Sequence, residues 1–220
     1  MAHTHDHDHD HDHDHAPIEE AAGPPTEDEI LEAALRELLI EKDIISAEDV
    51  HRQIDAMDSR SPALGAKVVA RAWQDEAFKA RLMEDPLPTI QDALGVDMTT
   101  PLELVVLENT DEVHNLVVCT LCSCYPRMLL GIPPAWYKSV AYRSRVVREP
   151  RAVLAEFGVT LPEATEVRVN DSTADLRYLV LPKRPLGTEG WSEDDLAALV
   201  TRDAMVGTAI PRVSGKESHA

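Results

Sequence analysis

The amino-acid sequence predicts a protein of the α+β or α/β class, with helices before residue 100 and strands after it. Apolar residues recur at helical spacing through 26–95, whereas short runs rich in Val and Leu appear only after Pro101. The chain has 220 residues, of which 44% are hydrophobic, so it can bury the core of one ordinary domain and carry an appendage.

The N-terminal segment 1–25 is predicted to be a disordered His/Asp tail that ends in a linker. Residues 3–15 alternate His with Asp, apart from one Thr, and hold seven of the ten histidines. This pattern has no apolar face and cannot bury a core. Because imidazole binds divalent transition metals, the tail is interpreted either as a weak metal collector or as a solvated extension without a role of its own.

Residues 26–100 are predicted to form a helical arm. Thr26 and Glu29 are spaced as a capping box, and two apolar rows at spacing four follow them. Further helices are expected after Ser46 and around Val68–Trp73, and Pro86 should interrupt the continuation. Short amphipathic helices without a sheet often lie on a partner, but packing against the rest of this chain is an equally good interpretation.

Residues 101–212 are predicted to hold the sheet and the functional site, and 213–220 a flexible C-terminus. The Val- and Leu-rich runs and the later alternating segments predict strands at 102–107, 113–119, 166–169 and 177–181. A helical stretch over 139–157 should be interrupted by Pro150 and end at Gly158, and Ser192 should begin a last helix.

The charge balance excludes some classes of protein. Lys and Arg total 21 and Asp and Glu total 40, which gives a net charge of −19, so a general nucleic-acid binder is not expected. The sequence has no apolar run of about 18 residues and no signal-peptide core. We therefore expect a cytoplasmic protein that neither spans a membrane nor is secreted.

All three cysteines, Cys119, Cys122 and Cys124, fall within six residues. An odd number at this spacing argues against a disulfide framework. A zinc site would need a fourth ligand from a distant histidine, and a redox Cys-X-X-Cys motif would leave Cys124 unexplained. The candidates for that fourth ligand are His51, His114 and His219. Both interpretations remain possible, but neither accounts for the whole spacing.

A tripeptide chelate accounts for the spacing of all three cysteines. The sulfur atoms of Cys122 and Cys124 and the backbone nitrogens of Ser123 and Cys124 can bind one metal ion in a plane, with Cys119 as an axial ligand. Backbone amides lose their protons only to a strongly polarising ion, which favours trivalent cobalt or iron over zinc. With its sixth position open, such a centre is a Lewis acid for an unsaturated small molecule.

The run Val-Cys-Thr-Leu-Cys-Ser-Cys at 118–124 resembles the metal-binding motif of the nitrile hydratase alpha subunit. Thr120 matches the cobalt type, because iron-containing members usually have Ser there. The resemblance covers most of 28–210, and further matching segments are Glu108–Thr110, Leu130–Lys138, Tyr142–Val147, Leu176–Tyr178 and Gly187–Ser192.

The resemblance implies an architecture and partners. Members of the family have a helical N-terminal arm and a globular domain of four layers, α-β-β-α. The arm wraps a beta subunit, two of whose arginines hold oxidised cysteines, and a small activator protein commonly loads the metal. We therefore expect a hetero-oligomer of two or three subunit types.

The resemblance also implies a reaction, the hydration of a nitrile to its amide. One Co(3+) per subunit is expected, with Fe(3+) as the less favoured ion. Cys119 would stay a thiolate, whereas Cys122 would become a sulfinic acid and Cys124 a sulfenic acid. The sulfenate oxygen of Cys124, or a hydroxide held at the metal, would attack the nitrile carbon. Tyr125 and Arg127 are the nearest candidates to line the pocket.

Arg127 departs from the nitrile hydratase pattern, which usually has Trp at this position. An Arg after Tyr-Pro, together with the His/Asp tail, is similar to the gamma subunit of thiocyanate hydrolase, which converts thiocyanate to carbonyl sulfide and ammonia. A buried guanidinium would suit an anion better than a neutral nitrile. Alternatively, Arg127 makes an ion pair between subunits. A non-catalytic metal carrier is a remote third interpretation.

Overall fold

The computed structural model describes residues 24–25, 27–58 and 60–213. Residues 1–23 of the predicted tail, the capping residue Thr26 and the last seven residues lie outside them. The chain divides into two compact units, Met1–Val50 and His51–Ala220. Within the described ranges, no helix is both long and apolar enough to cross a membrane.

Helix α1 (Glu27–Glu41) has three acidic residues in its first turn, where the helix dipole favours negative charge. None of its residues is buried, and four of its large apolar side chains are exposed: Ile30, Leu31 at 67%, Leu35 and Leu38. Helix α2 (Ala47–Asp58) begins after Ser46 as predicted, and the Ser46 hydroxyl accepts a hydrogen bond from the Asp49 amide at 3.0 Å.

Helices α3 (Pro62–Gln74), α4 (Glu76–Glu84) and α5 (Pro86–Leu94) belong to the main core. Pro86 ends the preceding stretch as predicted, and it is the first residue of α5, where a missing N–H costs nothing. Their buried side chains, Phe78 and Leu82 among them, share one cluster with the strands. These three helices therefore belong to the second compact unit, His51–Ala220, together with the strands.

The four strands form where the sequence predicted them. They are β1 (Glu103–Glu108), β2 (Val113–Val118), β3 (Glu166–Asp171) and β4 (Leu176–Leu181). Strands β1 and β4 pair in parallel, as do β2 and β3, with Val106 opposite Leu179 and Val118 opposite Asp171. Because parallel strands end at the same edge, the segment that follows β2 begins beside the end of β3.

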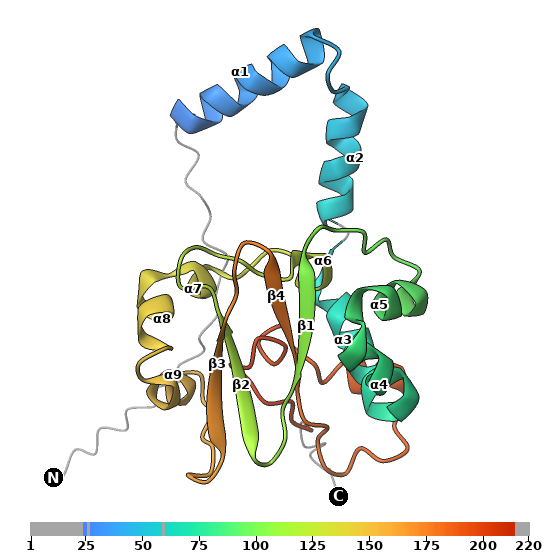
Figure 1. Cartoon of the computed structure of the whole chain (residues 1–220), viewed down its shortest axis with the longest axis vertical. Helices are drawn as coiled ribbons and strands as arrows, with labels where there is room; N and C mark the ends of the chain where they lie inside the picture. The colour runs from blue at the N-terminus through green and yellow to red at the C-terminus, as the bar shows by residue number, and fades with distance from the viewer. Residues whose placement is uncertain (1–23, 26, 59, 214–220) are drawn as a thin grey trace, which may run out of the picture. The chain divides into compact units, whose positions relative to one another are not determined.

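Helices cover both sides of the paired strands (Figure 1). On one side α4 and α5 contact β1, and on the other α9 contacts β3. The remaining helices are α6 (Arg127–Leu130), α7 (Ala135–Lys138), α8 (Val140–Arg145), α9 (Pro150–Glu156) and α10 (Glu193–Ala197). The order helix–strands–strands–helix confirms the predicted α+β class and its four layers.

The segment before Gly207 joins the two strand pairs. Val206 accepts a backbone hydrogen bond from Val117 in β2, and Met205 accepts one from Val180 in β4. Gly207 itself has φ of +92°, and a Cβ atom there would lie 1.9 Å from the carbonyl oxygen of Asn115. Only glycine fits this position, because the backbones of two segments touch there.

Candidate metal centre

The three cysteines lie in the loop that leaves β2 at the shared edge of β2 and β3. Cys119 directly follows β2 and is buried, Cys124 is half-buried, and Cys122 is exposed. The Cys122 sulfur lies 3.3 Å from the Cys119 sulfur and 3.3 Å from the Cys124 sulfur. All three sulfur atoms lie within 4.8 Å of one another, so the fold gathers the predicted side-chain ligands at one point.

Among the described residues, no histidine or carboxylate joins this group of possible ligands. His114 is buried, and its ring nitrogens contact the Gly207 carbonyl at 2.7 Å and the Asn109 amide at 3.3 Å. Burial lowers the pKa of His114, which favours its neutral form. His114 therefore supports the fold, and a tetrahedral zinc site lacks a fourth side-chain ligand in this part of the chain.

The thiols of the cluster differ in acidity. Hydrogen bonds from the Cys124 and Cys119 thiols lower the pKa of Cys122 to about 7, and the backbone N–H groups of Cys124 and Ser123 add to this effect. Burial, followed by the neighbouring thiols, raises the pKa of Cys124 to about 12. Three soft sulfur donors, with two backbone amides turned toward one of them, suit a thiophilic transition metal.

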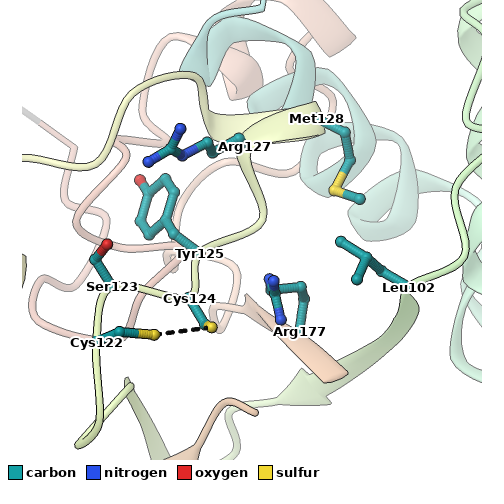
Figure 2. Close-up of a pocket in the computed structure, with 8 residues that line it drawn as sticks. All are labelled: Leu102, Cys122, Ser123, Cys124, Tyr125, Arg127, Met128 and Arg177. Atoms are coloured by element: carbon teal, nitrogen blue, oxygen red, sulfur yellow. Dashed lines mark hydrogen bonds between the residues drawn. The ribbon is translucent and has the colours of Figure 1, made fainter. Parts of the chain in front are cut away.

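A cavity of about 330 Å³ opens beside two of the cysteines (Figure 2). Its walls are Leu102, Cys122, Ser123, Cys124, Tyr125, Arg127, Met128 and Arg177. The exposed Arg127 comes from α6 and Arg177 from β4, so two guanidinium groups border the space. Tyr125 is only 3% exposed, and its hydroxyl has no hydrogen-bond partner among the described residues.

Sequence reasoning did not select Arg177 as a site residue. Its positive charge acts on Cys124 and opposes the rise of that pKa. The Leu-Arg-Tyr segment around it is part of the family resemblance, which by itself assigns no role to the arginine. The pairing of β4 with β1 places Arg177 opposite Leu104, close to Leu102 at the pocket wall, and no local pattern reveals this pairing.

Tyrosine hydroxyls hold the backbone around the cysteines. The Tyr137 hydroxyl donates to the Cys124 carbonyl at 2.8 Å, and the Tyr142 hydroxyl donates to the Val117 carbonyl at 2.8 Å. Tyr137 is fully buried, and its ring meets that of Tyr125 edge to face with centroids 5.1 Å apart. These contacts fix the end of the loop that carries Cys124.

We expect Tyr137→Phe to lower the free energy of unfolding by about 1–3 kcal/mol, because it leaves the Cys124 carbonyl without its donor. For a chain of this size the midpoint of thermal unfolding should fall by roughly 2–10 °C. Tyr178→Phe is the matched control, because no hydrogen bond of the Tyr178 hydroxyl occurs among the described residues. Equal midpoints for the two variants in calorimetry would contradict this role.

The sequence matches the family described as "Nitrile hydratase, alpha chain" over residues 26–209. It is 53% identical over 187 residues to the nitrile hydratase subunit alpha of a Rhodococcus species, covering 83% of this chain and 94% of that protein. It is 50% identical to the low-molecular-weight cobalt-containing subunit alpha of Rhodococcus rhodochrous, covering 83% and 88%. It is 47% identical to the thiocyanate hydrolase subunit gamma of Thiobacillus thioparus, covering 84% and 80%.

Solved structures resemble the fold as well. A recombinant thiocyanate hydrolase with partially modified cobalt centres superposes with a TM-score of 0.79 at 46% identity, covering 86% of this chain and 92% of that chain. A double mutant of the Fe-type nitrile hydratase of Comamonas testosteroni Ni1 superposes with a TM-score of 0.76 at 40% identity, covering 89% and 100%. This chain belongs to the nitrile hydratase alpha chain family.

Proposed function

We propose that this chain is the metal-bearing alpha subunit of a cobalt nitrile hydratase, which hydrates a nitrile to the corresponding amide. The observation that carries the proposal is the group of three sulfur atoms within 4.8 Å of one another, two of which belong to cysteines at the wall of a cavity. Cobalt-containing relatives at 49% and 50% identity support the choice of Co(3+), and the Fe-type structural relative leaves Fe(3+) as the alternative.

The proposed ligands are the sulfur atoms of Cys119, Cys122 and Cys124 and the backbone nitrogens of Ser123 and Cys124. A bound trivalent ion would supply Lewis acidity toward an unsaturated carbon–nitrogen bond. Leu102 and Met128 supply apolar groups to the wall of the cavity.

Cysteine oxidation is part of the proposal. Cys122 would carry a sulfinic acid and Cys124 a sulfenic acid, whose oxygen would face the substrate carbon in the cavity. Cys119 is only 1% exposed, which agrees with a sulfur that is not oxidised. Tyr125 lines the same cavity and would orient the substrate through its ring and its hydroxyl.

A partner subunit is part of the same proposal. Leu121 projects from the cysteine loop with 89% of its surface exposed, and Val140 on the adjoining α8 is 71% exposed. Helix α1 separately leaves Ile30, Leu31 and Leu35 more than half exposed. Large apolar side chains exposed in this number are typical of an interaction surface, and a beta subunit is the proposed occupant.

A second candidate is the gamma subunit of a thiocyanate hydrolase. The observation in its favour is the pair of guanidinium groups, Arg127 and Arg177, at the wall of the cavity. Guanidinium groups bind anions through charge-assisted hydrogen bonds, and thiocyanate is an anion whereas a nitrile is neutral. The overall identities to the two kinds of relative, 53% and 47%, are too similar to decide between them.

The choice between the two candidate functions can be tested with the cobalt-loaded complex. It is given a small aliphatic nitrile and thiocyanate in parallel reactions. We expect amide from the nitrile and no carbonyl sulfide from thiocyanate, with products identified by mass spectrometry. Arg127→Ala should then change kcat/KM for the nitrile by less than about threefold, since Arg127 is exposed.

Carbonyl sulfide and ammonia from thiocyanate would reverse the choice. In that case Arg127→Ala should lower kcat/KM for thiocyanate by about 10–100-fold, because it removes a charged hydrogen-bond donor from an anion. Arg148→Ala on the exposed surface is the matched control for loss of one guanidinium.

A further inference from the structure

Asp171 contacts the cysteine loop through Thr120, the residue between Cys119 and Leu121. The Thr120 backbone N–H donates to one carboxylate oxygen of Asp171 at 2.9 Å, and the Thr120 hydroxyl donates to the other at 2.6 Å. Both oxygens of one carboxylate are therefore used on a single loop residue. Two bonds in parallel fix the orientation of Thr120 and not merely its distance from β3.

Arg143 holds the third polar group of Thr120. Its guanidinium donates to the Thr120 carbonyl at 3.3 Å from α8. The N–H, hydroxyl and carbonyl of Thr120 thus all bond to residues outside the loop. Because these bonds come from two different elements, Thr120 cannot rotate without breaking at least one of them.

The fold sets the place of Asp171. Asp171 is the last residue of β3 and lies opposite Val118, the last residue of β2, in the parallel register. The amide of the following Ser172 donates to the Val118 carbonyl at 2.7 Å and continues this pairing by one residue. The carboxylate therefore lies where the chain leaves β2 and begins the cysteine loop.

We propose that Asp171 is a positioning residue for the metal centre, which orients the backbone between Cys119 and Cys122 through Thr120. This inference rests on the proposed function, because it assigns Asp171 to the outer contacts of the cobalt site. Residues that orient metal ligands in this way typically contribute 10–100-fold to metal affinity. Asp171 is exposed, so its removal should disturb the loop and leave the stability of the fold nearly unchanged.

The test is a titration of the reduced, metal-free, full-length chain with Co²⁺, followed through the thiolate-to-cobalt absorption bands. Binding replaces the thiol protons by the ion and requires no oxidant. We expect Asp171→Asn to weaken Co²⁺ binding at least about tenfold and to shift these bands, with an unchanged midpoint of thermal unfolding. Asp175→Asn is the matched control, because it removes the same charge from an exposed position four residues further on, in the connection between β3 and β4.

Variants of Thr120 test the route of the effect. Thr120→Val removes the hydroxyl, whereas Thr120→Ser keeps it, so only the former should weaken Co²⁺ binding. If Asp171 acts through Thr120, its replacement should cost less affinity in the Thr120→Val background than in the wild type. The inference would be overturned if the losses of Co²⁺ affinity from the Asp171 and Thr120 replacements were fully additive. It would also be overturned if Asp171→Asn kept the wild-type Co²⁺ affinity and the wild-type absorption bands.

Hydrogen exchange of the metal-free chain separates the inference from the proposed function. The amide of Thr120 should exchange faster in Asp171→Asn and at the wild-type rate in Asp175→Asn, because only the former replaces the two charged acceptor oxygens by one neutral oxygen and an NH₂ group. Failure of the wild-type chain to bind Co²⁺ would contradict the proposed function. An unchanged Thr120 exchange rate in Asp171→Asn would instead contradict the positioning role.

Discussion

Replacing Cys124 with alanine should abolish nitrile hydration by the cobalt-loaded complex. The change removes one of three sulfur donors that lie within 4.8 Å of one another. Loss of a residue that hydrogen-bonds to a metal ligand already lowers metal affinity or activity by about 10–100-fold. Loss of a ligand itself should therefore lower activity by more than about 100-fold. We expect cobalt content, measured by plasma mass spectrometry, to fall with it.

Substitutions at Ser123 distinguish a backbone ligand from a side-chain ligand. Ser123→Ala keeps the amide nitrogen and should retain bound cobalt, whereas Ser123→Pro has no N–H to lose and should not. Circular dichroism would show that each variant is folded. Cobalt content and activity at wild-type levels in Cys124→Ala would contradict the proposed centre, and cobalt retained by Ser123→Pro would contradict amide ligation.

Gly207→Ala should destabilise the fold more than any other change proposed for this chain. The new Cβ atom would lie 1.9 Å from the Asn115 carbonyl oxygen, which belongs to β2 and cannot move alone. The positive φ of 92° adds backbone strain of about 1–2 kcal/mol, and overpacking adds about 1–3 kcal/mol. The midpoint of thermal unfolding should fall by roughly 10 °C.

Gly187→Ala is the matched control for this effect. Gly187 has a positive φ of 77°, but a Cβ atom there would meet no atom within 4 Å. Its replacement should therefore show the backbone strain without the clash, and calorimetry should give a clearly smaller loss of stability. Equal losses at the two glycines would mean that the contact with Asn115 is relieved by movement of the chain.

Much of this protein could be predicted from local sequence. The three cysteines fall within six residues, so the closeness of their sulfur atoms could be predicted without knowledge of distant contacts. The four strands and the interruptions at Pro86 and Pro150 were likewise predicted, because hydrophobic periodicity and proline act over a few residues. The family resemblance supplied the order of the layers.

The tertiary structure decided what depends on contacts between distant segments. Parallel pairing of β2 with β3 places Asp171 beside Thr120, and pairing of β1 with β4 places Arg177 at the pocket. Neither follows from local patterns, since parallel partners are separated by long connections and their register depends on packing across the sheet. For the same reason only the folded core showed that α3–α5 share the cluster around the strands, whereas the sequence by itself determined that the three cysteines lie close together.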